Sequence, residues 1–147
     1  MSIKKLILLV GLCALFAGCS TGGYYASFAG EGNAKLGSRY LLGRGVPQNN
    51  KQAFYYFSKA AHDGDPFAQN ELAYMYAAGK GTPPNNVQAF KWYQKAAAHG
   101  LASAEYNLGL MYLHGIGTKP NKVLAKQWIR KSAALGFEPA VKTLAQL

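Results

Sequence analysis

The sequence has few of the residues from which catalytic and metal-binding sites are usually built. Its 147 residues include two cysteines, three histidines and six carboxylic acids, and these do not cluster. No G-x-S-x-G, H-E-x-x-H or C-x-x-C motif occurs, so nothing supports a serine hydrolase, a zinc peptidase or a thiol redox protein. No histidine has a carboxylate at metal-ligand spacing. We therefore expect a protein with no catalytic residue, no metal and no cofactor.

A hydrophobic run long enough to span a membrane is also missing, because such a helix needs roughly 20 apolar residues. The apolar run at residues 6–16 is shorter, follows Lys4 and Lys5, and ends in small residues. A positive, an apolar and a small-residue region in this order predict a secretory signal peptide over residues 1–18.

The end of this run, Leu15-Phe-Ala-Gly-Cys19, resembles the bacterial lipobox, although Phe16 stands where that family usually has Leu, Val or Ile. The resemblance implies that Cys19 receives lipid and becomes the mature N-terminus. Simple secretion and an uncleaved anchor are the alternatives. Ser20 after the cysteine resembles the pattern sorted to the outer membrane of Gram-negative cells, which implies a lipid-anchored protein facing the periplasm.

The cysteine positions also bear on stability. Cys13 lies in the predicted signal peptide and Cys19 would carry lipid, so the mature chain has no disulfide, and its stability must come from side-chain packing. Residues 19–31 are rich in glycine and serine without helical periodicity, which predicts a flexible tether between the lipid and the folded part.

Acidic residues are scarce relative to basic ones. Sixteen Lys and Arg against six Asp and Glu give a formal net charge of +10. A basic surface favours acidic proteins or anionic lipid headgroups, although the lysines could equally serve only to solvate the surface. Nucleic acid does not fit an exported protein. We expect another envelope or secreted protein with an acidic surface as the partner, and contact with the membrane through the N-terminal lipid.

The clearest feature of the sequence is an internal repeat of 36 residues without insertions. Leucine, tyrosine, glycine, alanine and lysine all recur at this step. The series are Leu36, Leu72, Leu108 and Leu144; Tyr40, Tyr76 and Tyr112; Gly43, Gly79 and Gly115; Gly45, Gly81 and Gly117; Ala53, Ala89 and Ala125; Lys59, Lys95 and Lys131; and Gly64, Gly100 and Gly136.

The first half of each unit predicts a helix, which we call helix A. In the second unit the apolar residues fall on one helical face, as expected for a buried stripe: Ala68, Leu72, Ala73 and Tyr76. Gly79 and Gly81 then end the helix, because glycine accepts the left-handed conformation of a helix terminus. Prolines follow, which cannot continue the helix.

The second half predicts helix B. An asparagine precedes it in every unit and can accept hydrogen bonds from the free amides of the helix start (Asn49, Asn85 and Asn121). Small residues along helix B allow neighbouring helices to approach closely. A glycine then stands at the C-terminal position that favours it (Gly64, Gly100 and Gly136). Each unit therefore reads helix, turn, helix, turn.

These residues resemble the Sel-one-like repeat, a 36-residue relative of the tetratricopeptide repeat with the pattern A-x3-L-G-x2-Y-x2-G-x-G followed by K-A-x2-W-x2-K-A-A-x2-G. The third unit begins Ala104-Glu-Tyr-Asn-Leu-Gly-Leu-Met-Tyr-Leu-His-Gly-Ile-Gly117. The resemblance extends over residues 32–147. It implies an all-α fold, a right-handed α/α superhelical solenoid of three helix-pair repeats and a C-terminal capping helix. The expected boundaries are 32–67, 68–103 and 104–139, with the capping helix at 140–147.

In tetratricopeptide-like solenoids helix A lines the concave side, and this geometry selects the residues beside the buried stripe. Aromatic side chains offer contact area with little entropy to lose, and asparagines can bond a peptide backbone. The alternative is that Tyr74 and Leu110 only fill space between adjacent helices A. The predicted partner-binding residues are Asn70, Tyr74, Tyr106, Asn107, Leu110 and His114, within a wider set that includes Lys35, Ser38 and Glu71.

Together these features predict a non-enzymatic envelope lipoprotein that serves as a protein–protein interaction scaffold or adaptor. The family resemblance implies two other functions. Small exported members occur as immunity proteins that neutralise phospholipase effectors of type VI secretion. Penicillin-binding or β-lactamase-like activity belongs to cysteine-rich exported members, which have a disulfide in each repeat that this chain lacks.

Overall fold

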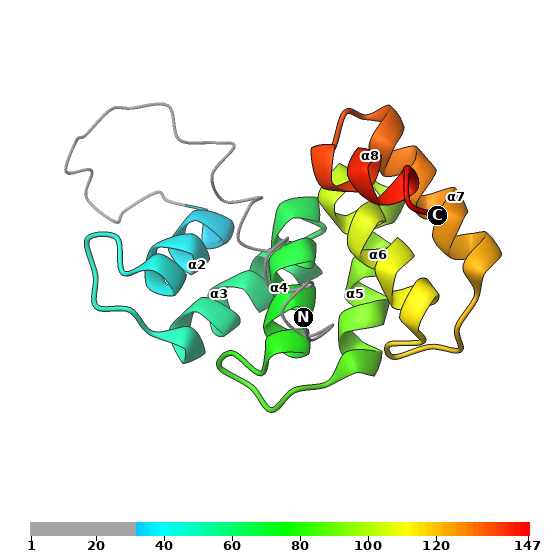
Figure 1. Ribbon diagram of the computed structural model, residues 1–147. Helices are drawn as coiled ribbons and strands as arrows, with labels where there is room; N and C mark the ends of the chain where they lie inside the picture. Colours follow the sequence, from blue (N-terminus) through cyan, green and yellow to red (C-terminus); the bar gives the residue numbers. More distant parts are fainter. Residues whose placement is uncertain (1–31) are drawn as a thin grey trace.

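The computed structural model describes residues 32–147, which form seven α-helices and no β-strand. Helices that follow one another in sequence pack against each other, and α2 and α8 lie at opposite ends of the stack (Figure 1). Helices A are α2, α4 and α6, and helices B are α3, α5 and α7. This arrangement confirms the predicted all-α solenoid. The helices are α2 (Asn33–Leu42), α3 (Asn50–His62), α4 (Pro66–Ala78), α5 (Asn86–Ala98), α6 (Ala102–His114), α7 (Lys122–Ala134) and α8 (Glu138–Leu144).

Every helix B begins at its predicted asparagine cap. The side-chain oxygen accepts from backbone amides of the first turn, as in the 3.0 Å bond from the amide of Gln88 to Asn85 Oδ1. The backbone amide of each cap residue also ties the turn to helix A by donating to a tyrosine carbonyl. These bonds measure 2.9, 2.8 and 2.7 Å (Asn49 to Tyr40, Asn85 to Tyr76, Asn121 to Tyr112).

The turn between helices A and B also joins one repeat to the next. Gly81 and Gly117 have φ values of +73° and +68°, so both adopt the left-handed conformation. A Cβ atom on either glycine would overlap the backbone carbonyl oxygen of Asn50 or Asn86, the first residue of helix B in the preceding unit. Glycine is therefore required here for the turn and also for the close approach of two repeats.

An aromatic pair beside each of these turns repeats the same contact. The rings of Phe54 and Tyr76 lie 5.2 Å apart at 87°, and those of Phe90 and Tyr112 have the same separation and angle. In both pairs the phenylalanine comes from helix B and the tyrosine from helix A of the next unit. Edge-to-face contacts of this kind are favourable for aromatic rings.

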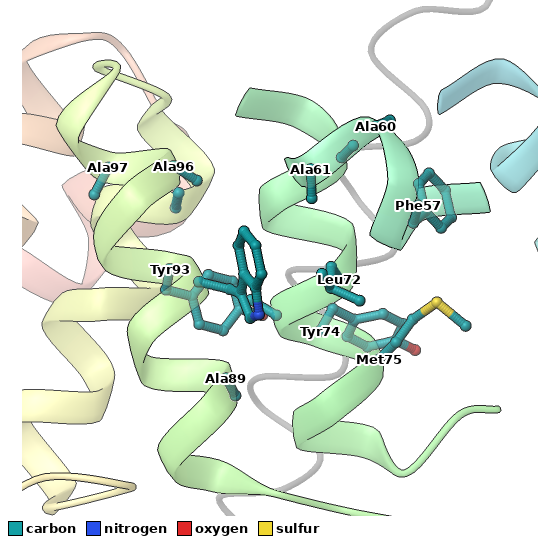
Figure 2. Packing of buried hydrophobic residues seen from close by; sticks show 14 of the residues in the cluster. Phe57, Ala60, Ala61, Leu72, Tyr74, Met75, Ala89, Tyr93, Ala96 and Ala97 are labelled. Carbon is teal, nitrogen blue, oxygen red and sulfur yellow. The ribbon is translucent and has the colours of Figure 1, made fainter. Parts of the chain in front are cut away.

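The largest buried cluster lies between α3, α4 and α5. Phe57, Leu72 and Tyr93 are at most 1% exposed. Figure 2 shows Tyr93 of α5 directed toward α4, with Ala89 and Ala96 along the same helix. Because these alanines are small, α5 can approach α4 closely and the aromatic ring fills the remaining space.

The C-terminal helix α8 packs on the third repeat, as the predicted capping helix should, although it begins at Glu138, two residues before the predicted start. Ala140 is fully buried in a second apolar cluster with Tyr106, Leu110 and Ile129. This cluster would be open to solvent without α8.

The predicted signal peptide at 1–18, the lipidated Cys19 and the tether at 19–31 lie outside the described residues. Between residues 32 and 147, no helix combines the length and hydropathy needed to cross a membrane.

We predict that Gly81→Ala destabilises the chain much more than Gly45→Ala does. Gly45 has nearly the same φ, +71°, but a Cβ there meets only the mobile end of the Arg39 side chain. The left-handed conformation alone should cost about 1–2 kcal/mol in both variants. Displacing the Asn50 carbonyl should add roughly 1–3 kcal/mol in Gly81→Ala. Urea unfolding of the two variants measures the difference, and equal losses would show that the repeats do not depend on this contact.

Candidate functional site

Two of the helices A are enclosed on every side along most of their length. All eight residues from Ala68 to Met75 in α4 are buried, and so are all nine from Ser103 to Met111 in α6. The sequence predicted one buried stripe on these helices. In the structure the polar side chains beside the stripe are buried as well.

Besides Ser103, five polar or acidic side chains lie in these two buried stretches. Asn70, Glu71 and Asn107 have no exposed surface, and Gln69 and Glu105 are nearly as buried. Asn70 Nδ2 donates a hydrogen bond of 3.0 Å to Glu71 Oε1. Glu71 and Asn107 occupy the same position of successive repeats. We call these five residues of α4 and α6 and Tyr93 of α5 the polar cluster, within which Glu71 interacts with Asn70 and Tyr93.

Most of the polar cluster's hydrogen-bonding capacity is unused. Buried polar atoms in native proteins nearly always have a partner, and leaving one without a partner costs roughly 1–3 kcal/mol. Both side-chain amide atoms of Asn107 lack any partner. Across the described residues the buried atoms without a partner are Gln69 Oε1, Asn70 Oδ1, Glu71 Oε2, Tyr93 Oη, Glu105 Oε2, and Asn107 Nδ2 and Oδ1.

Burial changes the protonation of the acids in this cluster. Desolvation raises the pKa of Glu71 from 4.5 to about 8, although the hydrogen bond from Asn70 and the charge of Lys80 oppose the shift. The Glu71 carboxyl is therefore mostly neutral at pH 7 and has a proton to donate. Burial also raises the pKa of Glu105, opposed by Lys131, and it raises the pKa of Tyr93 well above its usual value, with further contributions from Glu71 and Tyr74.

The cluster consequently offers both kinds of hydrogen-bonding group. The protonated Glu71 carboxyl, Asn107 Nδ2 and the Tyr93 hydroxyl can donate, whereas Asn70 Oδ1 and Asn107 Oδ1 can accept. A polypeptide backbone presents one donor and one acceptor for each residue other than proline. The chemistry of the cluster therefore suits a peptide backbone, which needs both donors and acceptors.

Three of the six predicted partner-binding residues belong to or border this cluster. Asn70 and Asn107 are members, and Tyr74 is 2% exposed. The Lys80 ammonium lies 5.0 Å from the centre of the Tyr74 ring, so the turn after α4 covers that ring. The predicted residue His114 is exposed at the last position of α6.

The other two predicted residues, Tyr106 and Leu110, lie under α8 in the structure. The Tyr106 hydroxyl lies 2.9 Å from Thr143 Oγ1, and its ring lies 5.5 Å from that of Phe137. Leu110 is 1% exposed in the same apolar cluster. Both side chains therefore stabilise the capping helix, and a partner could reach them only if α8 moved.

Sequence reasoning did not find Gln69, Tyr93 and Glu105 as members of the cluster. Glu105 carries no signal that could have identified it, since an acid in the first turn of a helix is common. Tyr93 carries none, because its position on helix B is a core position and only the fold brings its hydroxyl beside α4. No group of three or more metal-ligating side chains occurs in the part of the chain that the structure describes.

The stacked helix pairs place this protein among the helix-pair repeat proteins of the solenoid class, and its polar cluster lies on the inner helices of the stack. A sequence model described as the Sel1 repeat matches residues 30–65, 66–101 and 102–137, each two residues ahead of the boundaries predicted above. The chain belongs to the Sel1 repeat family, which confirms the resemblance to Sel-one-like repeats.

Three solved structures resemble the chain. A Sel1 repeat protein from Oxalobacter formigenes is 43% identical with a TM-score of 0.72, covering 78% of this chain and 86% of its own. The protective antigen c5321 of uropathogenic Escherichia coli, which has an SLR fold, is 38% identical with a TM-score of 0.70, covering 71% of this chain and 22% of its own. Helicobacter pylori cysteine rich protein B is 26% identical with a TM-score of 0.65, covering 97% and 94%. No curated protein matches the sequence.

Sel1 repeat proteins generally act as protein–protein interaction scaffolds without catalytic activity. The polar cluster is consistent with that general role, because it provides hydrogen-bonding donors and acceptors.

We predict that Glu71 makes the chain less stable as the pH rises. Its pKa is higher in the folded state than in the unfolded state, so the unfolded chain releases this proton first. The contribution of Glu71 to the free energy of unfolding should therefore be greatest below about pH 4.5. It should fall as the pH rises from 4.5 to about 8. The total change is on the order of several kcal/mol.

Urea unfolding at pH 5, 6, 7 and 8 tests this prediction, with Glu71→Gln as the matched variant. The glutamine retains the shape and cannot ionise, so the variant should lose most of the pH dependence and be more stable than the wild type at pH 8. A residual slope of the same sign is expected from Glu105. Parallel curves for the two proteins would contradict the assignment.

Proposed function

We propose that the protein is a non-enzymatic scaffold of the cell envelope that binds a segment of another polypeptide along α4 and α6. The observation that carries this proposal is the group of unpartnered polar atoms buried on these two helices. A structural core gains nothing from such atoms, whereas a partner backbone would satisfy them.

The arrangement of the groups favours an extended segment. Glu71 and Asn107 stand at equivalent positions of adjacent repeats, so a segment running from one repeat to the next meets a similar set of groups twice. Asn107 can donate and accept at once, which suits the paired donor and acceptor of one peptide unit. Main-chain bonds of this kind supply affinity, and neighbouring side chains supply specificity.

Tyr74 and His114 provide the contacts outside the polar cluster. Tyr74 is an aromatic ring that already attracts a cation, since the Lys80 ammonium lies over it. The cluster is buried in the free chain, so binding requires some of its cover to move. The long, flexible side chain of Lys80 can move at little cost, and an acidic group of the partner would draw it away from the ring.

We also propose that Cys19 anchors the chain to a membrane, which the lipobox-like ending before it supports. Cys19→Ser should move the protein from the membrane fraction to the soluble periplasmic fraction, because no other acceptor for the lipid remains. Fractionation of cells followed by immunoblotting measures the change, with Cys13→Ser as the control that should stay at the membrane. Retention of Cys19→Ser at the membrane would exclude lipidation as the anchor.

A second function, as an immunity protein against a phospholipase effector of type VI secretion, uses the same kind of surface with a different partner. The net charge of +10 favours it, since a basic surface speeds association with an acidic toxin. Protection of cells that express such an effector would support this function over a general adaptor. Catalysis has less support, because the described residues contain no cysteine and no group of three or more metal-ligating side chains.

We predict that Asn107→Leu stabilises the free chain and weakens partner binding. Leucine has the same branched shape as asparagine and removes two unpartnered polar atoms, so the free energy of unfolding should rise by about 1–2 kcal/mol. The same change removes the donor and the acceptor that we assign to the partner backbone. Urea unfolding gives the stability, and quantitative recovery of partners from envelope extract gives the binding.

Tyr106→Phe is the matched control, because it removes a hydroxyl that contacts only Thr143 of the same chain. It should lower stability slightly and leave partner recovery unchanged. If Asn107→Leu instead destabilised the chain and recovered the same partners in the same amounts, Asn107 would be a structural residue and the binding site would lie elsewhere.

A further inference from the structure

The outer side of α7 carries three cations that no described residue neutralises. Lys122, Lys126 and Arg130 are spaced by four residues, so they lie on successive turns about 6 Å apart along the helix. Lys122 and Arg130 are exposed, and Lys126 is half-buried. None of the three forms an ion pair with a carboxylate of residues 32–147, and α7 itself contains no acid. We call these three residues the cationic row.

Lys126 stands at a position that joins repeats elsewhere in the chain. The equivalent residues of the first two units are Phe54 and Phe90, and their rings pack against Tyr76 and Tyr112 of the next helix A. In the third unit a lysine replaces the phenylalanine. The contact surface of the third repeat is therefore charged where those of the first two are aromatic.

The other two cations of the row, Lys122 and Arg130, also stand where the earlier units have uncharged residues. Each cation replaces an uncharged residue at the equivalent position of both earlier units (Lys122 for Asn50 and Asn86, Arg130 for Ser58 and Gln94). The backbone carbonyls of Asn50 and Asn86 are those that the glycine turn of the next unit approaches. Lys122 and Lys126 thus occupy the surface on which a further repeat would stack, and Arg130 extends the row along the exposed side of α7.

The capping helix α8 packs against α7 where the next helix A would begin, but it is too short to cover all of that surface. α8 has 7 residues, whereas α4 and α6 have 13. Its last residue, Leu144, corresponds to Leu108 of α6, one helical turn before Tyr112. α8 therefore ends before the level at which a tyrosine would meet Lys126.

We infer that the cationic row binds an acidic helix of a partner protein, which lies along α7 on the surface that α8 leaves uncovered. At Lys122 and Lys126 this surface is one that accepts another helical unit, because the equivalent residues of the two earlier repeats meet the next repeat there. Carboxylates at positions i, i+4 and i+8 of a helix have the same spacing of about 6 Å as the cations. This site is separate from the polar cluster and does not depend on the function proposed for it.

A membrane surface fits the same face less well. A helix that lies in a membrane interface presents a broad apolar face to the lipid. The apolar residues Ala125 and Ile129 of α7 are fully buried in the protein, and Val123 is its only exposed large apolar residue among those described. Charge complementarity with a protein helix therefore accounts for this surface better than lipid insertion does.

The test uses the full chain and an alanine-based helical peptide with glutamates at i, i+4 and i+8. A peptide of the same composition with glutamates at i, i+2 and i+5 places them on different faces. Fluorescence anisotropy should show tighter binding of the first peptide, and added salt should weaken it. The variant K122Q/K126Q/R130Q should bind it about tenfold more weakly, since three ion pairs are lost.

The matched control is K51Q/K91Q/K95Q, which removes three exposed cations from α3 and α5 and causes the same change in net charge. It should lose less than about twofold in affinity, because residual long-range attraction is largely screened in salt.

Equal weakening by both variants, or equal affinity for both peptides, would overturn the inference in favour of diffuse charge. Binding to vesicles of phosphatidylglycerol, lost only in K122Q/K126Q/R130Q and without peptide binding, would assign the row to a membrane. Asn107→Leu should bind the peptide normally, so this inference and the proposed function fail separately.

Discussion

The stack depends on contact between the A–B turn of one repeat and the start of helix B in the repeat before it. At this point the backbone of Gly81 touches the carbonyl of Asn50, and the ring of Tyr76 meets Phe54. The cap residue Asn85 ties the same turn back to helix A through the Tyr76 carbonyl. In a linear repeat array each interface stabilises only its two neighbours, so a defect here separates two repeats and no distant contact compensates for it.

This repeated framework explains why polar side chains can persist in the interior. The contacts that recur from repeat to repeat lie at the ends of the helices. Individual positions in the middle of helix A can therefore differ between repeats. Lys35, Glu71 and Asn107 occupy one repeat position, and only Lys35, at the end of the stack, is exposed. The inner two repeats bury the same position between neighbouring helices. There a charged group would be costly, and the neutral carboxyl of Glu71 reduces that cost.

The 36-residue periodicity was sufficient to predict the repeats, the turns and the caps, because each of these depends on local residues. Asn49, Asn85 and Asn121 cap helices B for reasons that lie within one helical turn. The candidate site was harder to predict, because it depends on what covers each side chain. Tyr106 and Leu110 carry no local mark that α8 lies over them, and the hydroxyl of Tyr93 reaches the polar cluster only through the fold. Gly81 was predicted as a turn residue, but its contact with another repeat could not be inferred from its neighbours in sequence.

The binding that we propose for the polar cluster and the binding that we propose for the cationic row have different physical bases, and this difference predicts the order in which a partner would meet them. The row is exposed and charged, so it attracts an acidic partner over roughly the Debye length of 8 Å at physiological salt. The cluster is enclosed and uncharged while Glu71 is protonated, so it acts only at hydrogen-bond distance and is little affected by salt. A partner that used both surfaces would therefore meet the row first and bond the cluster afterwards. Salt would then slow its association, while a rise in pH above about 8 would ionise Glu71, remove a donor and speed its release.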